Sequence, residues 1–330
     1  MRAYIAPKGS TDPASVTCVV QDRPAPGPGQ VLVRMRAASL NARDLQIITG
    51  TYFLGPLERD TVPLSDGAGE VVEVGAGVAA FKPGDRVVAT FMQATPPGPL
   101  GSPLNGVLRD YAVFAADGLV PVPDYLSFEE AACMPCAGVT AWNALMHGPK
   151  PIRPGDTVLT LGTGGVSIFG LQIARMAGAR VIVTSSSDDK LARAAALGAH
   201  HGINYARRPD WDKEVLDLTG GRGVDHILET GGLGTLPRSY QAIGPQGVIS
   251  LFGMQTRPEG NLSPYPLLRK SAILRGLVVG SREHLEGLFK AGAANALRPV
   301  IDRVFAFDAF AEACAYQLSG QHFGKVVITI

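Results

Sequence analysis

The stretch from residue 156 to residue 199 constrains the fold of this chain most, because it reads as a strand, a turn, a helix and a second strand in direct succession. An apolar run at 157–161 predicts the first strand. Val166, Phe169 and Ile173 then recur at three- and four-residue steps, which predicts a helix with one apolar face. A second apolar run follows at 181–184. Because such a unit covers a parallel sheet with its helix, the predicted fold class is α/β.

The turn of this unit is rich in glycine. Gly162, Gly164 and Gly165 lie where the strand gives way to the helix, and Val166 opens the helix. Glycines let backbone N–H groups approach a pyrophosphate, and the helix N-terminus adds a positive dipole end. The second strand ends about 20 residues further on, as in dinucleotide-binding units. The turn therefore predicts dinucleotide binding rather than a purely structural role, although Ser167 replaces the third glycine of the usual fingerprint.

The end of the second strand predicts which cofactor is bound. NAD sites place Asp or Glu there, whereas this chain has Ser185, Ser186 and Ser187, followed by Lys190 and Arg193. Hydroxyls and cations suit a phosphate monoester. The prediction is NADP (NADPH), with NAD as the less favoured cofactor. The alternative is that Ser187 caps the next helix while Lys190 and Arg193 are solvated surface.

Composition limits the class of function. A chain of 330 residues with 46% hydrophobic and 18% charged residues supports two globular domains. The net charge of +1 gives no electrostatic case for nucleic acid or a membrane surface, so the expected partner is a small-molecule substrate. The first residues lack an apolar signal core and no window of 18 apolar residues occurs, so the expected location is cytoplasmic.

The chain before residue 125 differs in pattern from the chain that follows. Short apolar runs separated by turns predict an all-β, barrel-like region, in which Val31, Val33 and Met35 form an apolar face and Leu32, Arg34 and Arg36 a mixed one. Ser127 and Glu130 stand at capping-box spacing and predict a helix start. The predicted domain boundary lies at 124. Later strands at 203–205, 223–230, 247–253 and 273–279 alternate with helices, which predicts a doubly wound parallel sheet.

The four cysteines indicate neither a disulfide framework nor a zinc lobe. Cys133 and Cys136 form a C-x-x-C interrupted by Pro135, and no second pair exists. We interpret them as packing residues in preference to metal or redox residues.

Several motifs together resemble those of the medium-chain dehydrogenase/reductase superfamily, and within it the zinc-free quinone oxidoreductase-like branch. They are S-L-N-A-R-D at 39–44, G-T-Y at 50–52, D-G-A-G-E-V-V-E-V-G at 66–75, G-D-R-V at 84–87, P-C-A-G-V-T-A-W at 135–142, the glycine turn, G-V-D-H-I-L-E-T at 223–230 and H-F-G-K-V-V at 322–327. The resemblance implies a GroES-like β-barrel catalytic domain formed by 1–124 and 279–330 and a Rossmann domain formed by 125–278. It also implies a homodimer that pairs through the Rossmann domain.

The zinc ligands of the superfamily are missing at the matching positions. By the resemblance, Asn41, Ser65 and Cys136 stand where the zinc-dependent members have their three catalytic ligands, and Asp66 stands where many have a glutamate. One soft ligand cannot hold Zn²⁺. The segment 93–105 also has no cysteine for a structural zinc lobe. The prediction is that no metal is bound.

The resemblance also implies three catalytic residues. Without a Lewis acid, hydride transfer favours an acceptor that delocalises charge. Tyr52 resembles the tyrosine that protonates the product in related enoyl reductases, and its alternative is a partly buried barrel tyrosine. Asn41 is predicted to hydrogen-bond the substrate oxygen or the cofactor ribose, or else to cap the helix from Ala42. Asp44 is predicted to orient its neighbours.

Further cofactor contacts follow from the same resemblance, with ordinary packing as the alternative for each. Thr140 is predicted to face the nicotinamide, Tyr205 to stack near the adenosine phosphate, and two strand ends to contact the carboxamide: Phe252, Gly253 and Met254, and Val279, Gly280 and Ser281.

Taken together, the chain is predicted to be an NADPH-dependent, zinc-independent oxidoreductase that transfers hydride to a quinone or an α,β-unsaturated carbonyl. The alternatives are an NAD(P)-dependent alcohol or aldehyde dehydrogenase and an NADPH-binding protein with little activity.

Overall fold

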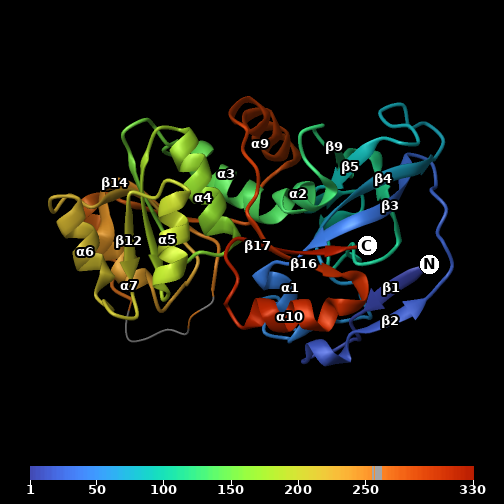
Figure 1. The fold of residues 1–330 in the computed structure, drawn as a ribbon, viewed down its shortest axis with the longest axis horizontal. Coiled ribbons are helices and arrows are strands. Elements are labelled where there is room, and N and C mark those ends of the chain that lie inside the picture. Colours follow the sequence, from blue (N-terminus) through green and yellow to red (C-terminus); the bar gives the residue numbers. More distant parts are fainter. Residues whose placement is uncertain (255, 257–261) are drawn as a thin grey trace. The chain divides into compact units, whose positions relative to one another are not determined.

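Two compact units make up the computed structural model, which describes residues 1–254, 256 and 262–330. Unit 1 contains Met1–Val139 and Gly280–Ile330, and unit 2 contains Thr140–Val279. Many of their elements are labelled in Figure 1. Among the described residues, no helix is both long and apolar enough to span a membrane.

The first junction between the units lies at Val139, later than the predicted boundary at 124. The helical pattern after residue 125 belongs to unit 1, because α2 (Phe128–Ala132) packs on β3 and β4 of that unit and buries Ala131 and Ala132. The predicted capping box at Ser127 and Glu130 does begin this helix. The change from strand to helix pattern therefore precedes the junction between the compact units.

Unit 1 is built on a seven-stranded sheet in the order β16-β17-β3-β4-β5-β9, with β8 also paired to β3. Arg34 of β3 is exposed while Val33 and Met35 are buried, as the alternation predicts. β17 pairs antiparallel with β3, so the C-terminal segment returns to the sheet formed by the first 124 residues. The strands of unit 1 are β1 (Arg2–Ile5), β2 (Thr17–Val20), β3 (Gln30–Ser39), β4 (Asp66–Val74), β5 (Arg86–Ala89), β6 (Met92–Ala94), β7 (Pro97–Pro99), β8 (Tyr111–Ala115), β9 (Leu119–Pro121), β16 (Ile301–Ala306) and β17 (Lys325–Thr329).

The helices of unit 1 range from α2, with 5 residues, to α9, with 14. One hydrophobic core joins α1 and α10 to the sheet, and the ring of Tyr4 lies 5.1 Å from that of Phe307 and 5.0 Å from that of Phe310 within it. Besides α2, the helices are α1 (Ala42–Ile48), α9 (Arg282–Asn295), α10 (Phe310–Leu318) and a π-helical turn, Met134–Gly138, together with 3₁₀ turns at Pro13–Ser15, Ala116–Gly118 and Phe307–Ala309.

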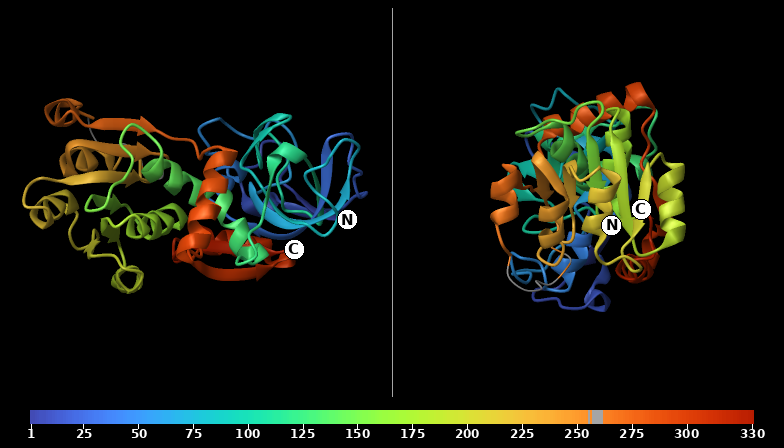
Figure 2. Two further views of the ribbon diagram at one scale, coloured as in Figure 1. Left: turned by 90° about the horizontal axis from the view of Figure 1, so that it is seen from above. Right: turned by 90° about the vertical axis from the view of Figure 1, so that its left-hand side faces the viewer.

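Unit 2 is a doubly wound parallel sheet, which confirms the predicted α/β class. Its strand order is β12-β11-β10-β13-β14-β15, and every pairing is parallel. The sheet can be followed in the two views of Figure 2. Its strands are β10 (Thr157–Thr160), β11 (Arg180–Ser185), β12 (His201–Asn204), β13 (Val224–Glu229), β14 (Ile243–Leu251) and β15 (Ile273–Gly276).

Helices flank this sheet on both faces. Trp211 and Val215 of α6 and Leu236 and Tyr240 of α7 share one apolar core with the strands. α4 and α5 pack on β10, β11 and β12. The helices of unit 2 are α3 (Val139–Met146), which starts at the junction, α4 (Gly165–Met176), α5 (Asp188–Ala196), α6 (Trp211–Leu218), α7 (Leu236–Ala242) and α8 (Tyr265–Lys270).

Candidate active site

The glycine turn of unit 2 has the geometry expected of a phosphate-binding turn. Gly162 adopts a φ of +76°, a conformation that side chains other than glycine rarely take. Its N–H donates to Thr184 Oγ1 at 3.1 Å, which ties the turn to the end of β11. Gly164 is the N-cap of α4, and no described side chain caps this helix. The N–H groups of the first turn are therefore left for a ligand, and the turn fits a dinucleotide pyrophosphate.

Ser167 has a defined structural role in this turn. It is buried, and its Oγ donates to the carbonyl of Leu161 at 2.7 Å, where Thr230 Oγ1 also donates at 3.0 Å. The hydroxyl thus satisfies a strand-end carbonyl that is withdrawn from water. This contact explains why serine is accommodated in place of the fingerprint's third glycine.

Close packing of α4 on the sheet depends on Gly170, which sequence reasoning missed. A Cβ at this position would lie 2.1 Å from Leu228 Cδ1 and 3.5 Å from Thr160 Cγ2. The role that the fingerprint assigns to its third glycine is therefore met three residues after Ser167, on the same face of the helix. A glycine at that spacing within a helical pattern was the available signal.

The three serines at the end of β11 have different environments. Ser185 is buried, and its Oγ accepts from the N–H of Ser187 at 3.2 Å. Ser187 caps α5 by accepting from the N–H of Lys190 at 3.4 Å, so its predicted structural alternative is confirmed. Ser186 is exposed and lines an open pocket at the ends of β11 and β12. Tyr205 follows β12 and donates its N–H to the carbonyl of Ser185 at 3.0 Å.

The loop after β13 is organised by Glu229, a second residue that sequence reasoning missed. This buried carboxylate accepts hydrogen bonds from the N–H groups of Gly231 and Gly232, at 2.9 and 3.1 Å, and from the hydroxyls of Thr235 and Ser239. Burial raises the pKa of Glu229, and these donors oppose that shift. All four donors lie within ten residues of Glu229, so an acidic strand end followed by two glycines and two hydroxyl residues was the available sequence signal.

The Phe252–Gly253 segment is held against the same strand end. The N–H groups of Phe252 and Gly253 both lie 3.3 Å from the carbonyl of Glu229. A Cβ on Gly253 would lie 2.0 Å from the carbonyl of Thr230, so this approach requires glycine. Met254 is exposed. A carboxamide contact from this segment would therefore use groups other than the two engaged N–H groups.

Val279 has a strained backbone at the other predicted carboxamide site. It is buried and adopts a φ of +48°, which is unfavourable for a β-branched residue. Asn143 of α3 donates to its carbonyl at 2.7 Å, and Arg275 donates to the side chain of Asn143 at 2.9 Å. Thr140 is buried on the same helix. Gly280 and Ser281 lie in unit 1, where Ser281 caps α9.

Unit 1 contains a continuous chain of hydrogen bonds from a lysine to an aspartate. Lys325 Nζ donates to Asn41 Oδ1 at 2.6 Å, and Asn41 Nδ2 lies 3.5 Å from Ser65 Oγ. Ser65 donates to Asp66 Oδ1 at 2.8 Å, and Asp66 Oδ2 accepts from the N–H of Cys136 at 2.9 Å. We call this series of hydrogen bonds the Lys325–Asp66 chain. The side chain of Asn41, one of the predicted catalytic residues, is part of it.

The strand order of unit 1 explains why these residues meet. Asp66 begins β4 and Lys325 begins β17, and both strands pair with β3. Ser39 of β3 lies opposite Asp66 on one side and Val327 on the other. Asn41 follows two residues later. Three neighbouring strands therefore bring together residues that lie far apart in the sequence.

The residues at the three zinc-ligand positions do not fit a zinc ion. The Lys325 ammonium already lies 2.6 Å from Asn41, and a divalent cation beside it would be repelled. Burial raises the pKa of the Cys136 thiol, whereas zinc binds thiolate. Across the described residues, no group of three or more His, Cys, Asp and Glu side chains is arranged to hold a metal.

Asp44 contacts Asn41 of the Lys325–Asp66 chain, and Arg43 contacts both Asp44 and Tyr52. Asp44 Oδ2 accepts from the N–H of Asn41 at 2.8 Å, which fixes the start of α1. Burial raises the pKa of Asp44 to about 6, and the charge of Arg43, 3.6 Å away, opposes the shift. The Arg43 guanidinium also lies 5.3 Å from the ring centroid of Tyr52, which is partly buried against the core. Asp44 thus fixes the backbone of Asn41, and its predicted orienting role in catalysis stays a prediction.

Comparison with known proteins agrees with both units. The alcohol dehydrogenase GroES-like domain matches residues 27–124, and the zinc-binding dehydrogenase domain matches residues 165–294. A zinc-type alcohol dehydrogenase-like protein of Schizosaccharomyces pombe is 45% identical, over 92% of this chain and 91% of its own. A quinone oxidoreductase of Pseudomonas aeruginosa is 35% identical, over 71% of this chain and 67% of its own. A solved structure described as an NAD-dependent alcohol dehydrogenase has a TM-score of 0.92 and 34% identity, and the match covers 100% of both chains.

The seven-stranded sheet of unit 1, the doubly wound sheet of unit 2 and these matches define an oxidoreductase built from two units. The chain belongs to the medium-chain dehydrogenase/reductase superfamily, as its motifs predicted. It is an oxidoreductase, and nicotinamide cofactors are those that this superfamily binds.

Proposed function

We propose that this protein is an NADPH-dependent, zinc-independent oxidoreductase that transfers hydride to a quinone or an α,β-unsaturated carbonyl. The observation that carries the proposal is the Lys325–Asp66 chain. A hydrogen-bonded lysine, amide, hydroxyl and carboxylate fill the place where other superfamily members hold zinc. A substrate that delocalises the incoming charge needs less Lewis-acid assistance than an alcohol or a simple aldehyde does.

The residues of unit 1 supply hydrogen-bond donors and a proton in this proposal, while bound NADPH supplies the hydride. The Lys325 ammonium polarises the amide of Asn41 through the 2.6 Å bond to Oδ1. An amide Nδ2 carries two hydrogens, and Ser65 engages one of them. The other can stabilise the developing negative charge on a substrate oxygen. Tyr52 then donates the proton that neutralises the product.

The cofactor preference rests on the end of β11. Ser185 stands there instead of the carboxylate that accepts the ribose 2′-OH in NAD sites. Lys190 and Arg193 on α5 add positive charge one turn further on. A negatively charged 2′-phosphate suits this segment better than a neutral hydroxyl does.

An NAD(P)-dependent alcohol or aldehyde dehydrogenase is the second candidate. It is favoured by the similarity to the structure described as an NAD-dependent alcohol dehydrogenase. A cofactor-binding protein with little activity is the third.

Measuring the zinc content and the turnover of one purified preparation separates the three candidate functions. We expect purified protein without stoichiometric zinc to oxidise NADPH with a quinone or an enone, at the same rate before and after chelation. Stoichiometric zinc with chelator-sensitive alcohol oxidation would instead support the second candidate. Tight NADPH binding without turnover across quinones, enones and aldehydes would support the third.

A further inference from the structure

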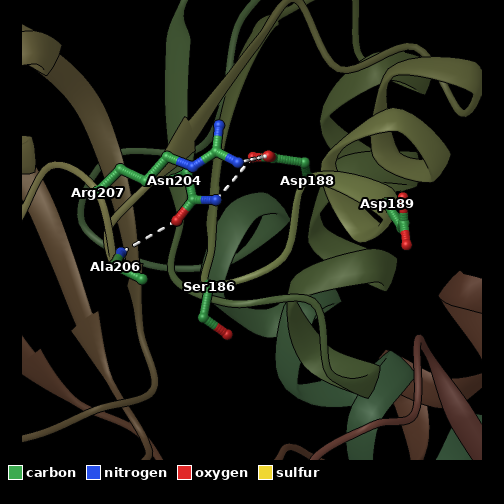
Figure 3. A pocket seen from close by; sticks show the side chains of 6 residues that line it. All are labelled: Ser186, Asp188, Asp189, Asn204, Ala206 and Arg207. Atoms are coloured by element: carbon green, nitrogen blue, oxygen red, sulfur yellow. Dashed lines mark hydrogen bonds and ion pairs between the residues drawn. The ribbon is translucent and has the colours of Figure 1, made fainter.

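An open pocket of about 340 Å³ lies at the carboxyl ends of β11 and β12 in unit 2. It is lined by Ser186, Asp188, Asp189, Asn204, Ala206 and Arg207 and is shown in Figure 3. Ligands of open parallel sheets bind outside the carboxyl ends of the strands, and the ribose that carries the 2′-phosphate binds near the end of the second strand. The pocket is therefore placed for the adenosine end of the cofactor.

Both carboxylate oxygens of Asp188 are engaged in this pocket. Arg207 Nη2 lies 2.5 Å from Asp188 Oδ2, and Asn204 Nδ2 donates to Asp188 Oδ1 at 2.6 Å (Figure 3). The orientation of the Asn204 amide is fixed in turn, because its Oδ1 accepts from the N–H of Ala206 at 3.1 Å. Asp188 is thus neutralised by Arg207 and turned toward the end of β12.

This ion pair is well placed to exchange with a ligand. The side chains of Arg207 and Asp188 are 73% and 49% exposed, and ion pairs at such positions contribute little to stability. A guanidinium has five N–H donors and binds phosphate in a bidentate manner. A phosphate dianion carries more charge than the carboxylate it would replace, whereas a ribose hydroxyl carries none.

We propose that Arg207 binds the 2′-phosphate of NADP and that Asp188 competes with this phosphate for Arg207, so that the Asp188–Arg207 ion pair sets the cofactor preference. The inference rests on the NADPH part of the proposed function and adds the residues that determine it. Neither residue contacts the site of hydride transfer in this assignment. Substitution of either residue should change cofactor binding and leave the hydride-transfer step unaltered.

Binding of two adenosine nucleotides to the full chain tests the proposal without any turnover. Adenosine 2′,5′-diphosphate and 5′-AMP differ only in the 2′-phosphate, so the ratio of their dissociation constants isolates that group. We expect wild type to prefer the 2′-phosphorylated probe and Arg207→Gln to reduce the preference about tenfold. Asp188→Asn should increase the preference severalfold, because its amide oxygen can still accept from Asn204 but no longer holds Arg207 by charge.

The neighbouring Arg208 provides a matched control. It is 67% exposed, pairs with Glu214 at 3.7 Å and does not line the pocket. Arg208→Gln changes the net charge equally and should leave the preference unchanged. An equal loss in both variants would overturn the assignment, because it would reflect overall charge.

Two further results distinguish this inference from the proposed function. A wild-type preference for the 2′-phosphorylated probe that survives in Arg207→Gln would overturn the role of Arg207 and leave the NADPH proposal intact. A wild-type chain that binds both probes equally would overturn both. Quinone or enone turnover is measured separately and does not depend on either result.

Discussion

Lys325 shows how the role of one residue depends on its non-local neighbours. Its side chain is almost fully buried, and its Nζ donates to the carbonyl of Leu40 as well as to Asn41, each at 2.6 Å. A buried ammonium requires such acceptors. Burial raises the pKa of Asp66, and the charge of Lys325 and the hydrogen bond from Ser65 oppose that shift.

The buried carboxyl of Asp44 predicts a pH-dependent stability. Its pKa of about 6 lies above the unfolded value of about 4, so ionisation is disfavoured in the folded state. Its contribution to stability is present below pH 4 and is lost as the pH rises through 6. Asp44→Asn removes this titration. We expect the unfolding free energy of the variant, relative to wild type, to rise by up to about 3 kcal/mol between pH 4 and 7.

Urea denaturation of both proteins at several pH values measures this difference. The asparagine keeps an acceptor for the N–H of Asn41, so the start of α1 is preserved. A difference that stays constant between pH 4 and 7 would contradict the prediction.

The proposed proton donor predicts a selective loss of turnover in Tyr52→Phe. The variant keeps the ring that packs against Arg43 and Phe53 but loses the hydroxyl. We expect turnover of an enone to fall by about 100-fold or more. NADPH affinity and the free energy of unfolding serve as controls and should stay near wild type. Unchanged turnover in a folded variant would show that another group donates the proton.

At the scale of elements, the contact between α4 and the sheet predicts a stability effect at Gly170. Gly170→Ala places a methyl group against Leu228, which is fully buried and has little room to shift. We expect the free energy of unfolding to fall by about 1–3 kcal/mol. Chemical denaturation checks this value, and Gly170→Ala combined with Leu228→Val should cost less than the sum of the two single changes.

Gly276 provides the matched control in the same unit. A Cβ at this position meets nothing within 4 Å, and its φ is not in the left-handed region. Gly276→Ala should therefore change the unfolding free energy by no more than about 0.5 kcal/mol. Equal effects at the two glycines would contradict the packing argument.

At the scale of the whole molecule, we expect the predicted homodimer to pair through the sheet edge of unit 2. β15 is the edge strand, and its side chains Ile273 and Leu274 are exposed, as is Val278 just beyond it. An exposed apolar edge strand favours pairing with another strand. We expect light scattering to show a dimer that Leu274→Asp converts to a monomer.

Val20 offers a control at an edge in unit 1. It is 85% exposed in β2, which pairs with β1 in a two-stranded sheet. Val20→Asp should leave the dimer unchanged. A wild-type monomer, or dissociation by both variants alike, would contradict pairing through β15.

The sequence by itself determined the α/β class, the glycine turn and the absence of a zinc-ligand set. These features depend on local sequence. Apolar periodicity predicts helix or strand, and a glycine such as Gly162 can adopt the left-handed backbone conformation that the turn requires. Asn41 and Ser65, at two of the three motif positions, were enough to exclude the zinc-ligand set. The roles of Tyr52, Thr140 and the other predicted site residues stay predictions.

Only the tertiary structure decided which distant residues meet. Lys325 reaches Asn41 because β17 pairs with β3, and Gly170 is required because α4 lies against Leu228 of β13. The ion pair of Arg207 with Asp188 likewise depends on the adjacency of β11 and β12. Strand order is set by the burial of whole faces, and local periodicity does not encode it.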